Sequence, residues 1–211
     1  MWWYHQRVPV FGQGGNMAEI SSRDIVLLLL GLSPGGTTTE GLGGITRLQK
    51  LLFLLEREEQ IIPAGNTFQF TAYKAGPYSS RLYDDLEFLE NLGLVESEIV
   101  SEATEPEAAE VEEMTFDDLV SDGQSVPEEN MKAADAYEEH RFALTPRGLA
   151  KVEELVENRE FKPAVDAIRA VKSRFGRYSL SDLLYYVYTK YPDMALESEI
   201  KDKVLRRHHT R

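Results

Sequence analysis

The chain has 211 residues, a hydrophobic fraction of 42% and no cysteine. This length suits one domain with an appendage, and the composition is that of a chain that folds around an apolar core. The missing thiols exclude disulfides and thiolate metal sites, and the longest apolar run, Ile25 to Leu30, is too short to cross a bilayer. Because the first residues also lack the apolar core of a signal peptide, we expect a soluble, cytoplasmic protein with no membrane partner.

The acidic residues are concentrated in one segment. Residues 96–139 contain sixteen Asp or Glu and one basic residue, Lys132, whereas the whole chain has a net charge of −13. The rest of the chain is therefore close to neutral. The segment lacks steady apolar periodicity, which predicts a disordered insertion. We favour a solvated loop, with a nucleic-acid-mimicking or autoinhibitory arm and an adaptation to a salty cytoplasm as the alternatives.

The N-terminal part predicts a tail followed by a buried helix. Residues 1–16 are expected to form a flexible extension, because the sequence from Met17 reads like a natural start. A serine-capped, almost fully apolar helix is predicted over Ser22 to Leu32. The Gly- and Thr-rich stretch after it is a linker. It lacks a preceding strand and a Gly-Lys-Ser/Thr ending, so we do not interpret it as a phosphate-binding loop.

A second helix is predicted to begin at Thr46, which forms a capping-box pattern with Gln49. Its core-facing stripe follows helical spacing: Leu48, Leu51, Leu52 and Leu55. The residues left for solvent or a ligand are Arg47, Gln49, Lys50 and Arg57.

Alternating aromatic residues from Phe68 to Tyr73 predict a short strand, which Gly76-Pro77 ends. We expect Pro77 to start the next helix. The leucines assigned to the core face of that helix are Leu82, Leu86, Leu89 and Leu92. Tyr78, Ser79, Ser80 and Arg81 are placed at the helix start, where free backbone N–H groups favour phosphate.

Two further strands surround the acidic segment. Gly93 to Val95 begins one, His140 to Leu144 forms the other, and Thr145-Pro146 caps and starts a helix. This order predicts a winged helix-turn-helix over residues 17–160, with the insertion 96–139 at the tip of the wing. The fold class is therefore mainly α with a small β-hairpin (α+β). A tip of such negative charge would be repelled by DNA phosphates.

Residues 161–211 predict a C-terminal helical annex with apolar stripes over Phe161–Phe175, Leu180–Tyr191 and Ser198–His209. Four tyrosines of the middle helix are expected to fill the core or an interface: Tyr185, Tyr186, Tyr188 and Tyr191. An added helical layer of this kind is compatible with a homodimer.

No catalytic constellation follows from the sequence. The four histidines lack the spacing of metal ligands, and the adjacent pairs Asp84-Asp85 and Asp117-Asp118 diverge on a helix instead of sharing one site. We therefore expect no enzymatic activity, no cofactor and no metal site.

Three motifs carry a family resemblance. GITRLQKLLFLLE (Gly44–Glu56), YKAGPYSSRLYDDLEFLENLGLV (Tyr73–Val95) and RFALTPRGLAKV (Arg141–Val152) together resemble the YwgA-like proteins. They are more distantly similar to the SocA-type antitoxin (Panacea) domain. The resemblance implies a winged-helix unit without established enzymatic activity. For the SocA relatives it also implies a protein-interaction role, as a toxin-neutralising protein or an adaptor.

Two functions are consistent with these patterns. The first is a non-enzymatic winged-helix interaction module, antitoxin-like or associated with phage defence, that binds a protein partner. The alternative is a transcriptional regulator that binds double-stranded DNA. The same residues are the binding candidates in both: Arg47, Lys50, Tyr73, Lys74, Tyr78, Ser79, Ser80 and Arg81.

Overall fold

The computed structural model describes residues 20–33, 36–38, 42–59, 67–100 and 139–209. Most of them are helical. The α-helices in this part of the chain are α1 (Ser22–Gly31), α2 (Ile45–Leu54), α3 (Ser80–Asn91), α5 (Pro146–Glu157), α6 (Lys162–Phe175), α7 (Leu180–Lys190) and α8 (Lys201–His209). Shorter helical turns are the π-helix η1 (Leu55–Glu59) and the 3-10 helices η3 (Arg159–Phe161) and η4 (Pro192–Ala195).

The strands are short and form small antiparallel sheets. They are β1 (Leu32–Ser33), β2 (Gly36–Thr37), β3 (Leu42–Gly43), β4 (Thr71–Tyr73), β5 (Gly76–Tyr78), β6 (Val95–Val100) and β7 (Glu139–Leu144). β1 pairs with β2, β4 pairs with β5, and the third sheet has the order β3-β7-β6. The expected mainly helical α+β class is confirmed.

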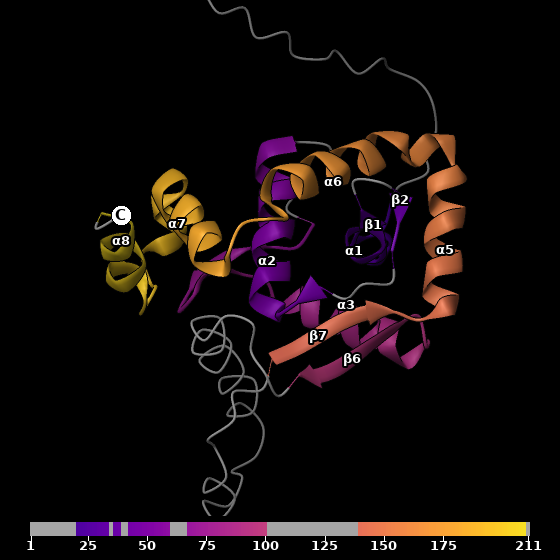
Figure 1. Ribbon diagram of the computed structural model, residues 1–211, viewed down its shortest axis with the longest axis horizontal. Coiled ribbons are helices and arrows are strands. Elements are labelled where there is room, and N and C mark those ends of the chain that lie inside the picture. Colours follow the sequence, from indigo (N-terminus) through magenta and orange to yellow (C-terminus); the bar gives the residue numbers. More distant parts are fainter. Residues whose placement is uncertain (1–19, 34–35, 39–41, 60–66, 101–138, 210–211) are drawn as a thin grey trace, which may run out of the picture.

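Helix α1 lies at the centre of the larger part of the molecule. Figure 1 shows it surrounded by α2, α5, α6 and the β6–β7 hairpin. Ser21 and Asp24 form a reciprocal capping box at its start. Its apolar residues from Ile25 to Leu30 are at most 2% exposed. A helix that is apolar on every side requires such an enclosure.

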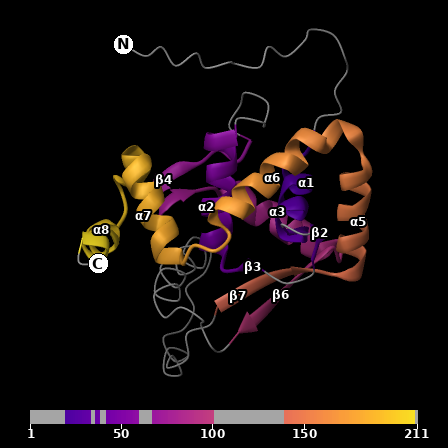
Figure 2. The same cartoon turned by 45° about the horizontal axis from the view of Figure 1, so that its top comes forward.

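The C-terminal helices belong to the same hydrophobic core as the preceding part of the chain. The buried cluster runs without a break from Ile25 on α1 to Val204 on α8. Its members on α6 include Val165, Ile168 and Val171, which confirms the predicted stripe. Figure 2 shows α7 and α8 at the end of the molecule that also holds β4. In this part of the chain, no helix has both the length and the apolar character that a membrane crossing requires.

The long hairpin confirms the predicted pairing across the acidic segment. β6 and β7 are in register from Val95 opposite Leu144 to Val100 opposite Glu139. The segment thus begins and ends with strand, so its expected bounds of 96–139 were too wide. The predicted disorder of residues 101–138, and the predicted extension 1–16, lie outside the described residues.

Helix α2 differs from its prediction at its start. It begins at Ile45 after Gly44, which has a φ of +73° and supplies no side-chain cap. Thr46 therefore lies inside the helix, and the side-chain Oε1 of Gln49 accepts from Ser79 N–H instead of closing a capping box. Gly44 follows β3 directly, so the start of the helix is set by the strand and its glycine.

Helix α3 begins later than predicted. Gly76 and Pro77 form β5 and do not end the strand, since Ala72 pairs with Pro77 and Tyr73 with Gly76. Ser79 is the N-cap, and its hydroxyl accepts from Leu82 N–H at 3.3 Å. Leu82, Leu86 and Leu89 are buried as expected, but Leu92 is 41% exposed and its assignment to the core was wrong.

Candidate partner-binding site

In the segment formed by α2, α3 and the β6–β7 hairpin, the side of α3 that faces solvent is open to a partner. Ser80 and Arg81 are exposed in its first turn. Asp84, Glu87 and Asn91 follow on the same side. Phe88 is 40% exposed and lies four residues before Leu92, so the two apolar side chains are neighbours on the helix surface. We refer to these seven positions as the α3 face.

One side of the α3 face is fixed by an arginine from α1. Arg23 lies with its guanidinium carbon 3.6 Å from the centre of the Phe88 ring. The same side chain forms an ion pair with Asp85, at 3.0 Å between Nε and Oδ1. Asp85 is only 3% exposed, so it does not contribute negative charge to the surface. The arginine thus both pairs a buried carboxylate and supports Phe88 in an exposed position.

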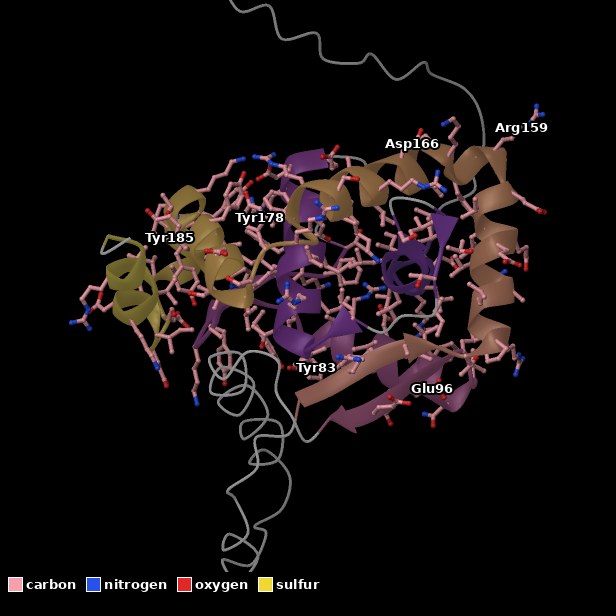
Figure 3. All side chains as sticks on the ribbon, viewed as in Figure 1. Tyr83, Glu96, Arg159, Asp166, Tyr178 and Tyr185 are labelled. Carbon is pink, nitrogen blue, oxygen red and sulfur yellow. The ribbon has the colours of Figure 1, made fainter. Side chains whose placement is uncertain are left out.

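Arg47 faces the C-terminal helices. Its Nη1 donates to the carbonyl oxygen of Tyr178 at 2.6 Å. Tyr178 lies where the chain passes from α6 to α7, beside α2 (Figure 3). Arg47 is half-buried there, so it joins two parts of the fold instead of facing open solvent.

Lys50 is 2% exposed, and its expected exposure was wrong. Its Nζ donates to the Pro77 carbonyl oxygen at 3.0 Å. Gln49 is also buried, at 1% exposed, and its Oε1 accepts from Ser79 N–H at 2.7 Å. The β4–β5 hairpin covers this side of α2, which the helical periodicity of α2 alone could not indicate.

The predicted tyrosines meet next to this buried lysine. Tyr73 and Tyr78 lie on paired strands, and their ring centres are 4.9 Å apart. Both are half-buried and line a small hollow together with Gln49, Lys50 and Pro77. The structure therefore brings Lys50, Tyr73 and Tyr78 together, whereas Arg47 lies toward α6 and α7, and Ser80 and Arg81 belong to the α3 face.

The hairpin that carries the tyrosines is held by the C-terminal part. The Lys74 carbonyl oxygen accepts from Glu199 N–H at 2.9 Å. Gly76 has a φ of +88°, and a Cβ at this position would lie 2.6 Å from the Tyr188 ring. Tyr188 is 2% exposed, and burial raises its pKa to about 12. Glycine is thus required where the hairpin meets α7.

Glu58 forms a second polar cluster, which the sequence did not reveal. Its carboxylate lies at 2.7 Å from donors on Arg174, Tyr186 and Lys190, and at 3.3 Å from the Tyr191 hydroxyl. Burial alone would raise the pKa of Glu58, but the hydrogen bonds from Lys190 and Tyr186 lower it below its ordinary value. The donors come from α6, α7 and the residue after α7, so the cluster joins the C-terminal helices to η1.

No family model and no curated protein sequence matches the chain. The YwgA-like and SocA-type resemblance consequently stays a prediction from the three motifs.

Proposed function

We propose that this protein is a non-enzymatic winged-helix interaction module that binds a protein partner through the α3 face. The order of α2, α3 and the β6–β7 hairpin corresponds to that of a winged helix-turn-helix and supports this proposal. In such folds the second helix of the pair is the one that meets the ligand. Here that helix is α3.

The exposed apolar pair of the α3 face favours a protein partner over DNA. Phe88 and Leu92 are 40% and 41% exposed, next to Asp84 and Glu87. The pair lies at the C-terminal end of α3, and large apolar side chains that face solvent favour a protein interface. Carboxylates on the same surface disfavour a DNA phosphate backbone.

The positions of the basic side chains also favour a protein partner over DNA. Arg47 and Lys50 donate to backbone carbonyl oxygens within the fold, so these contacts would have to break before either residue gripped a phosphate. Arg81 is left as the exposed cation of the α3 face. The SocA-type resemblance supplies the proposed class of partner, a toxin that the protein neutralises or a protein that it delivers as an adaptor.

The test compares partner capture by matched surface variants. In Phe88→Ser/Leu92→Ser, the apolar pair is removed. In Leu196→Ser, an equally large apolar residue is removed at a position that is 73% exposed and outside the α3 face. We expect the wild type and Leu196→Ser to retain one stoichiometric protein at moderate salt, and the double variant to lose it.

Two results would contradict the proposal. Equal capture by all three proteins would remove the α3 face from the interface. If instead the purified wild type is a dimer in sedimentation and the double variant is a monomer, the α3 face binds a second copy of this chain.

The alternative function, a DNA-binding regulator, is supported by the exposed first turn of α3. Ser80 and Arg81 occupy the positions from which a recognition helix reaches base edges. If DNA is the ligand, Arg81→Ala should weaken binding by about 1–3 kcal/mol, the size of one good contact. Fluorescence anisotropy with duplex DNA measures this directly, and an unchanged affinity would exclude Arg81 from a DNA site.

A further inference from the structure

A small hollow between α2 and the β4–β5 hairpin is a candidate ligand site that is separate from the α3 face. It lies beside Gln49 and Lys50, and Tyr73 and Tyr78 line it from the hairpin. Its volume is about 10 Å³. That is the room that one water molecule, or one oxygen atom of a larger ligand, requires.

One of the residues that line the hollow has a buried donor without an acceptor in the described part of the chain. Gln49 is 1% exposed, and its Oε1 is held by Ser79 N–H at 2.7 Å. This hydrogen bond fixes the orientation of the amide. Within the described part of the chain, the other atom of the amide, Nε2, has no hydrogen-bond partner. A buried donor of this kind is costly unless a ligand or water satisfies it.

The charge of the lining selects the kind of acceptor. Lys50 contributes a buried ammonium, which its hydrogen bond to the Pro77 carbonyl oxygen holds in place at 3.0 Å. Among the described residues, none that lines the hollow is acidic. A fixed amide donor and a fixed positive charge, both on buried side chains that line the same hollow, favour an anionic oxygen over a neutral one.

We propose that this hollow binds a carboxylate group, with one oxygen accepting from Gln49 Nε2 close to the Lys50 ammonium. The rest of the ligand would lie outside against Tyr73 and Tyr78, whose rings are half-buried and 4.9 Å apart. Two sources share this chemistry, a small free carboxylic acid and the C-terminal carboxylate of a peptide.

The test follows the side-chain amide of Gln49 by NMR in the full-length protein, titrated with sodium acetate, acetamide or sodium chloride at matched ionic strength. The amide signal is assigned by its loss in Gln49→Glu. We expect a saturable shift with acetate in roughly the millimolar range, because so small a ligand offers few atoms for binding. Acetamide, the neutral isostere, should bind at least about tenfold more weakly, since it lacks the charge.

The variants separate the site from general charge effects. Gln49→Glu keeps an acceptor for Ser79 N–H but replaces the free donor with an anionic oxygen. Acetate binding, followed in the variants by the Tyr73 and Tyr78 ring signals, should then weaken about ten- to a hundredfold. Gln69→Glu adds the same charge at an exposed position outside the hollow and should leave binding unchanged.

The titrations distinguish a peptide C-terminus, a small free acid and a water molecule as the occupant of the hollow. N-acetylalanine binding about tenfold more tightly than acetate assigns the site to a peptide C-terminus, whereas equal affinities assign it to a small free acid. Absence of a saturable shift, or equal effects of acetate and acetamide on the wild type, would overturn the proposal and leave a site for one water molecule only. This decision needs the wild type alone, so it does not depend on the folding of either variant.

Discussion

Lys172 shows how the environment of a single residue can be tested through its titration. Its Nζ donates to the Leu29 carbonyl oxygen in the last turn of α1, at 2.8 Å. The helix dipole favours a cation there. Burial outweighs this effect and lowers the pKa of Lys172 from 10.5 to about 8. NMR of the side chain should therefore show a titration near pH 8.

The same shift predicts a pH dependence of stability. Between pH 8 and 10.5 the unfolded chain holds the Lys172 proton more often than the folded chain, so this residue makes the protein more stable as pH rises through that window. Compared with Lys172→Met, the free energy of unfolding of the wild type should rise by on the order of 3 kcal/mol across the window. A constant difference between the two proteins in urea titrations would show that Lys172 is solvated.

The spacing of apolar residues along a helix predicts which side chains of that helix are buried. It does not predict burial by an element that comes later in the chain. The buried leucines of α3 follow from their spacing. Gln49 and Lys50 do not, because the hairpin that covers them comes more than twenty residues later in the chain. The prediction that Leu92 is buried was wrong for a different reason. It is the C-cap residue, so the helical spacing ends there.

At the scale of elements, the contact between α5 and the turn that precedes β6 depends on Gly148. Thr145 caps α5 and also donates to the carbonyl oxygens of Gly93 and Leu94. A Cβ on Gly148 would lie 1.9 Å from the Leu94 carbonyl oxygen. Gly148→Ala must therefore displace the backbone of one element, and we expect thermal unfolding to show a loss of about 1–3 kcal/mol or more.

Gly93→Ala is the matched comparison. Gly93 has a φ of +65°, but a Cβ there would meet no described atom within 4 Å. Gly93→Ala should lower the free energy of unfolding by only the cost of a left-handed backbone for alanine, about 1–2 kcal/mol. If Gly148→Ala is the milder of the two, the close approach of α5 to the Leu94 carbonyl oxygen does not determine stability at this junction.

The Glu58 cluster connects η1 to α6 and α7, and it predicts acid sensitivity. The folded protein lowers the pKa of Glu58 below 4.5, so its contribution is present above that pH and is lost as pH falls through the lowered value. Arg174 and Lys190 remain about half-exposed, which limits the strength of both ion pairs. We expect Glu58→Gln to cost about 1–3 kcal/mol at neutral pH in urea unfolding.

The neighbouring residue provides the control for this cluster. Glu59→Gln removes the same charge one position along η1, where no pair with Arg174 or Lys190 is described. The cost of Glu58→Gln should shrink in acid, whereas Glu59→Gln should stay close to the wild type throughout. A pH-independent cost would assign the effect of Glu58 to packing.

Some elements could not be predicted from the sequence because they are too short to carry a period. β1, β2 and β3 have two residues each and lie in a stretch that composition describes as a linker. β3 forms only through its pairing with β7, about a hundred residues away. The β6–β7 hairpin and α5 were predictable, because alternation and the Thr-Pro cap are local signals.

For the whole molecule, the distribution of charge separates the two candidate functions. Residues 101–138 contain thirteen acidic residues and one lysine, so their removal changes the net charge from −13 to about −1. Val100 and Glu139 are cross-strand partners, so an Asn-Gly turn can join them and close a two-residue hairpin. The shortened protein therefore tests DNA binding without the electrostatic repulsion of that segment.

We expect neither the full-length nor the shortened protein to bind mixed-sequence duplex DNA in anisotropy measurements at about 0.1 M salt. The α3 face keeps Asp84, Glu87 and its apolar pair in both proteins, and Lys50 stays within the fold. Circular dichroism should first establish that the shortened protein is folded. Binding by the shortened protein alone would mean that a DNA-binding surface exists and that residues 101–138 inhibit it. Salt-sensitive binding by both would favour the regulator, since a repulsive segment that changes nothing cannot lie near the DNA.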